Sequence, residues 1–210
     1  MDKRFAIFDM DGTLIDSMPF WKNLASEYLN SKGIEKIPAD ILEQIKPMTM
    51  SESAALFRQE FGLSDDPETE MNAMMDDHYR NDIPLKSGVR EYLQKLHSSG
   101  VRMCVASATA EYLMESCLTR LGVRDYFEFL LSCETVGAGK RSPAVYHVSA
   151  KRLNATPEQI AVYEDALYAV QTAKGAGYYT VGVYDDSAAG NWEAIEKLSD
   201  EIILNWEEVL

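Results

Sequence analysis

Basic residues are scarce in this sequence relative to acidic ones. Lys and Arg number 20 against 34 Asp and Glu, which gives a formal net charge of −14. Nucleic-acid backbones need a basic footprint, so we expect no general nucleic-acid partner. Any anionic ligand must therefore be held by a few local cations, by helix termini or by a bound metal, against an unfavourable overall field.

Cysteines and long apolar runs are also few. Cys104, Cys117 and Cys133 are an odd number without metal-type spacing, which favours reduced core residues over disulfides. No apolar run is long enough to span a bilayer. Near the N-terminus "RFAIF" gives way at once to "DMDG", unlike the apolar core of a signal peptide. We therefore expect a cytoplasmic protein without a membrane partner.

The 210 residues suffice for one substantial core plus an insert. Short apolar segments typical of buried strands alternate with helix-spaced apolar positions after residue 84, and this alternation predicts an α/β fold. Helices would cover both faces of a parallel sheet. The predicted strands are "RFAIFD", "VRMCVAS", "FEFLLS", "IAVYED", "YYTVGV" and "EIIL".

Residues 17–83 have a different character and contain no convincing strand. Apolar residues recur there at helical spacing, and Lys46-Pro47 and Asp65-Asp66-Pro67 are predicted helix breaks. We therefore predict a core of residues 1–16 and 84–210, with a helical insert at 17–83. One face of a predicted helix carries Met71, Met74, Met75, His78 and Tyr79.

Polar side chains follow four of the predicted strands or the loops after them. Parallel strands end at one edge of a sheet, where open α/β folds bind ligands. Segments far apart in the sequence therefore deliver carboxylates, a hydroxyl and an ammonium to one place. These residues are Asp9, Asp11 and Thr13 after the first strand, Ser107 after the second, Lys140 after the third, and Glu164 and Asp165 at the fourth.

This set of residues suits phosphoryl transfer. Asp9 and Asp11 are two residues apart in an extended segment, so their side chains lean the same way and their proton affinities are pushed apart. One can act as nucleophile while the other carries a proton. Asp165 adds an oxygen ligand, and magnesium is the cation that best suits such a site. The cation, Lys140 and backbone amides would supply positive charge around the transferred group.

Single motifs here have other interpretations. Asp-x-Asp-Gly is also a common turn or the start of a calcium loop, but a calcium loop requires other residue types at Thr13, Leu14 and Phe20. The run "GAGKRS" superficially resembles a phosphate-binding P-loop, but Glu134 replaces its first glycine. A single serine or lysine is more often a surface residue than a ligand. The hypothesis of a phosphoryl-transfer site therefore depends on the convergence of these residues at one edge of the sheet.

Four ordered motifs then resemble the haloacid dehalogenase superfamily, in its phosphatase and beta-phosphoglucomutase-like branch. "FDMDGTLIDS" at 8–17 is similar to the first motif, and "VASAT" around Ser107 to the second. "GKRSPAVY" from Gly139 is similar to the third, and "VYEDALYAVQTAKGAG" at 162–177 to the fourth. The resemblance covers essentially the whole chain. It implies a doubly wound, Rossmann-like core with an α-helical cap, residues 17–83, inserted after the first motif.

The resemblance also implies a mechanism and a cofactor. Asp9 would form a phospho-aspartyl intermediate, and Asp11 would perform general acid–base catalysis. Mg2+ would be bound by Asp9, by Asp11 through its backbone carbonyl, and by Asp165, with Glu164 nearby.

The remaining implied site residues would hold phosphate. Ser107, the Ala108 amide and Lys140 would bind the transferred phosphoryl group, and Thr13 belongs to the same expected set. The substrate would be a small phosphorylated metabolite, acted on by a monomer or a weak homodimer.

The chain departs from the family pattern at a few positions. Ala144 stands where many relatives have Asp, and Ala166 and Ala169 replace the usual Ser and Gly. Mutases of the branch typically carry His where Trp21 stands and tend to lack the Thr13 hydroxyl, so both residues favour hydrolysis. A sugar phosphomutase remains the alternative, followed by a dehalogenase and a non-catalytic relative.

Overall fold

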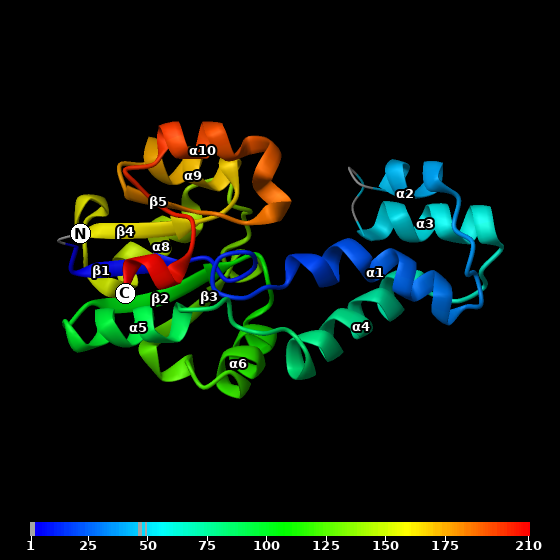
Figure 1. Ribbon diagram of the computed structural model, residues 1–210, viewed down its shortest axis with the longest axis horizontal. Coiled ribbons are helices and arrows are strands. Elements are labelled where there is room, and N and C mark those ends of the chain that lie inside the picture. The colour runs from blue at the N-terminus through cyan, green and yellow to red at the C-terminus, as the bar shows by residue number, and fades with distance from the viewer. Residues whose placement is uncertain (1–2, 46–47, 49) are drawn as a thin grey trace. The chain divides into compact units, whose positions relative to one another are not determined.

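The computed structural model describes residues 3–45, 48 and 50–210. Its internal contacts divide the chain into two units, Met1–Ser17 with Ile83–Leu210, and Met18–Asp82. The first unit is an α/β domain and the second is helical (Figure 1). The interpretation of the helical unit as a cap stays a prediction.

The α/β unit contains a six-stranded parallel sheet in the order β3-β2-β1-β4-β5-β6. Every strand lies within one of the six apolar segments, which confirms the predicted fold class. The first strand is central, because Phe5 pairs with Arg102 on one side and with Ile160 on the other. The strands are β1 (Phe5–Phe8), β2 (Arg102–Ser107), β3 (Phe127–Ser132), β4 (Ile160–Glu164), β5 (Tyr179–Val183) and β6 (Glu201–Ile203).

Helices follow the strands and cover the sheet on both faces (Figure 1). The strands are therefore apolar on both sides, as parallel sheets require. The α-helices of this unit are α5 (Val89–Ser98), α6 (Glu111–Arg120), α7 (Cys133–Val136), α8 (Ala144–Leu153), α9 (Leu167–Gly175) and α10 (Trp192–Leu198). The described part of this unit also contains the 3-10 helices η1 (Arg124–Tyr126), η2 (Pro157–Gln159), η3 (Asp186–Asn191) and η4 (Trp206–Val209).

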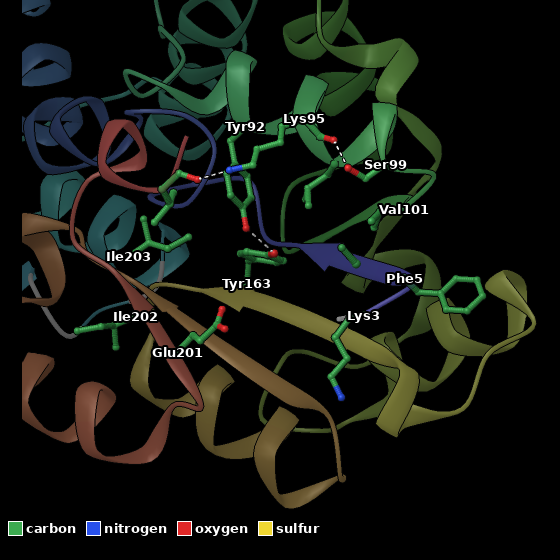
Figure 2. Close-up of a pocket in the computed structure, with 13 residues that line it drawn as sticks. Lys3, Phe5, Tyr92, Lys95, Ser99, Val101, Tyr163, Glu201, Ile202 and Ile203 are labelled. Carbon is green, nitrogen blue, oxygen red and sulfur yellow. Dashed lines mark hydrogen bonds between the residues drawn. The ribbon is translucent and has the colours of Figure 1, made fainter. Parts of the chain in front are cut away.

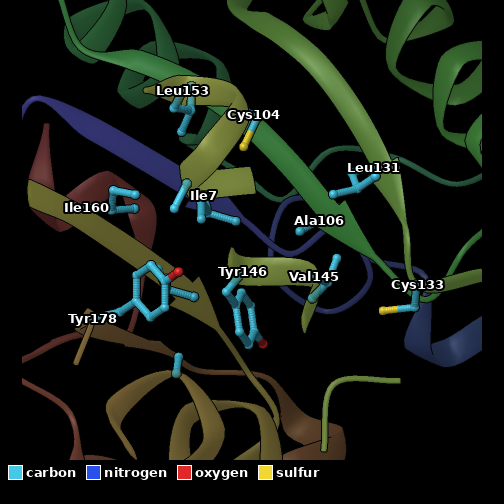
Figure 3. Close-up of a cluster of buried hydrophobic side chains, with 13 residues drawn as sticks. Ile7, Cys104, Ala106, Leu131, Cys133, Val145, Tyr146, Leu153, Ile160 and Tyr178 are labelled. Atoms are coloured by element: carbon cyan, nitrogen blue, oxygen red, sulfur yellow. The ribbon is translucent and has the colours of Figure 1, made fainter. Parts of the chain in front are cut away.

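One face of the sheet packs on α8 through a cluster of buried side chains (Figure 3). Ile7 and Cys104 from the strands meet Tyr146 and Leu153 from the helix there. On the other face, Phe8 stacks on Tyr163 with ring centroids 4.2 Å apart. The three cysteines are free and buried, and this confirms their predicted place in the core.

The helical unit consists of α1 (Met18–Ser31), α2 (Ala39–Ile45), α3 (Met50–Phe61) and α4 (Pro67–Asn81). The predicted face of α4 is confirmed, since Met71, Met75 and Tyr79 are buried. Proline begins this helix at a position where its missing N–H leaves no donor unpaired. The other predicted break, Lys46-Pro47, lies outside the described residues.

His78 joins α1 to α4 within the helical unit. Its Nδ1 lies 2.8 Å from Asp82 Oδ2, and its Nε2 lies 3.0 Å from Glu27 Oε2. Burial lowers the pKa of this imidazole, but the two carboxylates outweigh burial and raise it. The contacts that join these helices therefore favour the protonated ring.

The segment by which the chain leaves the α/β unit and the segment by which it returns are joined by backbone hydrogen bonds. Asp16 N donates to Pro84 O at 3.0 Å, and Lys86 N donates to Leu14 O at 3.0 Å. The Lys86 ammonium then reaches the segment after β5, where it lies 2.8 Å from Asp185 Oδ2. This largely buried ion pair therefore links the returning segment to the end of the sheet.

A cavity of about 480 Å³ lies between α5, β4 and β6 (Figure 2). Tyr92 and Tyr163 line it, and their hydroxyls are 2.9 Å apart. The acidic residues predicted for the site are not among its lining residues. Of the helices in the described ranges, none combines the length and the apolar character that a bilayer crossing requires.

Candidate active site

Three buried carboxylates meet at the carboxyl ends of β1 and β4. Asp9 directly follows β1, Glu164 ends β4 and Asp165 comes next. The pairing of the two strands continues past β1, because Asp9 N donates to Tyr163 O at 3.0 Å. One carboxylate oxygen from each residue lies within 4.8 Å of the others. Parallel pairing of neighbouring strands thus creates the acidic cluster that the sequence predicted.

Lys140 inserts its ammonium between two of these carboxylates. The residue lies in the turn before α8, and it is only 6% exposed. Its Nζ bonds to Asp9 Oδ1 and lies 2.7 Å from Glu164 Oε1. Burial lowers the pKa of Lys140, but the charges of both carboxylates outweigh burial and raise it. The group therefore remains a cation beside the expected nucleophile.

One ammonium does not compensate three buried carboxylates. Burial raises the pKa of Asp9, Glu164 and Asp165, and Lys140 opposes the rise. Nearby negative charge raises these pKa values further, from Asp11 at Asp9 and from Asp9 at both Glu164 and Asp165. A divalent cation would add the missing positive charge and favour the ionised forms. The donor set consists of carboxylate oxygens, which hard cations such as Mg2+ prefer. The residues present therefore fit the expected metal.

Asp11 belongs to a neighbouring group of hydroxyls. Ser17 Oγ donates to Asp11 Oδ1 at 2.6 Å, and Thr109 Oγ1 donates to Asp11 Oδ2 at 2.6 Å. Ser107 Oγ is 3.5 Å from the same Oδ2. The chain turns sharply after Asp11 through Gly12, whose φ of 78° suits a residue without Cβ. Both carboxylate oxygens of Asp11 are thus held by hydrogen bonds.

The other predicted residues surround these two groups. Thr13 is buried, and its hydroxyl lies 3.4 Å from Asp165 Oδ1. Ser107 is buried and accepts a hydrogen bond from Thr109 N at 3.1 Å, while Ala108 is exposed in the same loop. The structure thus brings the predicted carboxylates, lysine and hydroxyls to one edge of the sheet. Their individual roles stay predictions.

Three residues of this region were not singled out from the sequence. Ser17 ends the first motif and Thr109 follows Ser107 by two residues, so proximity to the motifs was the available signal. Tyr146 belongs to an apolar helix face and donates to Glu164 Oε1 at 2.8 Å. No local feature of the sequence indicated this contact.

The comparison with protein families agrees with this fold. The model of the haloacid dehalogenase-like hydrolases matches residues 6–183. The chain belongs to this family. The match confirms the resemblance that the four motifs indicated.

The names of similar proteins indicate the class of enzyme further. The phosphorylated carbohydrates phosphatase of Thermotoga maritima is 27% identical over 95% of each chain. Fructose-1-phosphate phosphatase YqaB of Escherichia coli K12 is 30% identical over 87% of this chain and 98% of that protein. A beta-phosphoglucomutase-like structure from Thermotoga maritima has a TM-score of 0.84 and 26% identity, with 99% and 96% of the two chains covered. The chain is an enzyme of the phosphatase class within this superfamily.

Proposed function

We propose that this enzyme hydrolyses a phosphate monoester of a small phosphorylated metabolite, through a phospho-aspartyl intermediate on Asp9. The observation that carries the proposal is the contact of the buried Lys140 ammonium with Asp9, beside two further carboxylates. A carboxylate nucleophile next to a fixed cation suits attack on an anionic phosphoryl group. Relatives named as sugar-phosphate phosphatases make phosphorylated carbohydrates the first substrates to examine.

The reaction would proceed in two displacements at phosphorus. In the first, Asp9 forms a bond to phosphorus as the ester P–O bond breaks, and Asp11 gives its proton to the leaving oxygen. In the second, Asp11 takes a proton from water, and the resulting hydroxide attacks phosphorus and releases Asp9. The hydroxyls of Ser17 and Thr109 would orient the Asp11 carboxylate for both proton transfers.

Positive charge and exclusion of water would complete the mechanism. Lys140 and Ser107, with the Ala108 amide, would stabilise the equatorial phosphoryl oxygens. Asp9, Asp165 and the backbone carbonyl of Asp11 would hold Mg2+, with Glu164 nearby, and the cation would supply Lewis-acid charge stabilisation. The helical unit would act as the cap that closes over the substrate and selects the leaving group.

Replacement of the nucleophile tests this proposal. Asp9→Asn should lose nearly all phosphatase activity and stay folded, because an amide is a poor nucleophile. The matched control is Asp125→Asn, which removes an exposed carboxylate from η1. The assay follows phosphate release from p-nitrophenyl phosphate and from a panel of sugar phosphates, with circular dichroism as a check of folding. Substantial turnover by Asp9→Asn would show that water attacks phosphorus directly.

Removal of metal provides a second test. Excess chelator should abolish phosphate release, and added Mg2+ should restore it. Ca2+ should inhibit, because its larger and more flexible coordination shell disturbs in-line geometry. Full activity in excess chelator would refute the metal assignment.

A sugar phosphomutase is the alternative, since one similar structure belongs to a beta-phosphoglucomutase-like protein. The two functions differ in the fate of the phosphoryl group. Incubation with β-glucose 1-phosphate and a trace of the bisphosphate primer separates them, when glucose 6-phosphate and free phosphate are followed together. We expect free phosphate to dominate. Glucose 6-phosphate appearing well ahead of free phosphate would favour the mutase.

A further inference from the structure

Tyr146 has a polar contact that its apolar surroundings do not require. The residue is fully buried in α8, and its ring lies in the cluster between this helix and the sheet (Figure 3). Phenylalanine would fill nearly the same volume there without introducing a hydroxyl that needs a partner. The hydroxyl donates to Glu164 Oε1 at 2.8 Å. The phenol oxygen therefore points from the core toward the acidic cluster.

The same Glu164 oxygen also contacts Lys140. Lys140 Nζ lies 2.7 Å from Glu164 Oε1, so a neutral and a charged donor converge on one atom. Both donors come from the short segment 140–146, which comprises a turn and the start of α8. The Tyr146 bond thus fixes the carboxylate and also the position of the turn that carries the lysine.

We propose that Tyr146 is a positioning residue of the candidate metal site, whose hydroxyl holds Glu164 and, through the shared segment, Lys140. This inference rests on the proposed function. A carboxylate near a cation needs a fixed orientation, and hydrogen-bond partners of such groups tune metal affinity. Without the phenol hydroxyl, the position of Glu164 Oε1 would depend on its contact with Lys140, and Lys140 also contacts Asp9.

The test is the Tyr146→Phe variant, with metal binding measured directly. Isothermal titration of the metal-free protein with Mg2+, in the absence of substrate, should show an affinity about 10–100-fold weaker than wild type. The melting temperature without Mg2+ should fall by what the loss of one buried hydrogen bond implies. The rise caused by a fixed Mg2+ concentration, measured from each protein's own metal-free value, should be smaller than in wild type. Steady-state assays should show a higher Mg2+ requirement, with activity recovering at high Mg2+.

Tyr178→Phe is the matched control. Tyr178 is buried in the same cluster, and its hydroxyl lies 3.0 Å from His147 Nδ1, away from the carboxylates. Its variant should bind Mg2+ like the wild type. Equal losses in both variants would indicate a general packing effect and refute the positioning role.

Mg2+ binding and phosphate release by the wild type distinguish an error about Tyr146 from an error about the proposed function. A wild type that neither binds Mg2+ nor releases phosphate would refute both. A wild type that does both, together with a Tyr146→Phe variant of unchanged Mg2+ affinity, would refute the role of Tyr146 alone.

Discussion

Removal of Lys86 should destabilise the α/β unit by an amount that the structure allows us to estimate. The ammonium contacts Asp185 Oδ2 at 2.8 Å and donates to Tyr184 O at 3.0 Å, and the Asp185 side chain is 6% exposed. Lys86→Met keeps the apolar stem but leaves Asp185 with donors from Ser187, whose backbone N lies at 2.9 Å. Loss of one partner of a buried pair costs about 3–5 kcal/mol. Because Lys86 is 15% exposed, we expect the lower end of this range.

A loss of about 3 kcal/mol corresponds to a fall of about 6–12 °C in melting temperature for a chain of this size. Thermal unfolding followed by circular dichroism and tryptophan fluorescence measures it. The double variant Lys86→Met/Asp185→Leu should regain most of the loss, since apolar replacement of a whole buried pair is often neutral or stabilising. Lys197→Met is the control, because it removes an exposed pair with Glu193 worth at most about 0.5 kcal/mol.

The stabilisation that the Lys86–Asp185 pair provides should depend on pH. Burial raises the pKa of Asp185, but hydrogen bonds from Lys86 and Ser187 outweigh burial and lower it. A carboxyl with a lowered folded pKa stabilises the fold above its unfolded pKa of about 3.9, and this contribution is lost as pH falls through the folded value. The difference between wild type and Lys86→Met should therefore shrink in acid, where Asp185 is protonated in both proteins. A Lys86→Met variant that melts like the wild type at neutral pH would refute the reasoning.

Three further changes test other parts of the molecule. His78→Gln should remove a stabilisation of the helical unit. This stabilisation is present below the unfolded pKa of about 6.5 and is lost as pH rises through the raised folded pKa. Unfolding of both proteins at pH 6 and pH 9 measures it. Thr109→Val removes a donor to Asp11 worth about 1.5–3 kcal/mol, so kcat should fall about 10–100-fold, while Thr109→Ser should retain activity. Gly182→Ala places a methyl 2.7 Å from Ile195 Cγ2 and should destabilise by about 1–3 kcal/mol in urea unfolding.

The strands were predictable because parallel sheets covered on both faces produce continuous apolar runs. "FAIF" of β1 and "IAVYE" of β4 have no regular polar alternation and stand out from the flanking polar residues. The meeting of Asp9 with Asp165 followed from a rule about sheet edges, which needs only the strand directions. Much of the acidic cluster was therefore encoded in local sequence.

The hydrogen bonds that orient the site residues were not predictable in this way. Thr109 Oγ1 reaches Asp11 across a separation of 98 residues, and Trp206 Nε1 donates to Thr13 O across 193. No local pattern indicated that the Tyr146 hydroxyl faces Glu164. Such contacts depend on packing between distant segments, to which local periodicity is insensitive.

The central place of β1 has a consequence for the order of folding. This strand is made first, but its partners β2 and β4 are separated from it by the helical unit and much of the core. Closing such long loops costs entropy before any sheet pairing compensates it, and sheets of this kind fold slowly. During synthesis, β1 cannot be enclosed on both sides until β4 has been translated. Asp9 therefore acquires its buried surroundings late, and a nascent chain that ends before Glu164 lacks the acidic cluster.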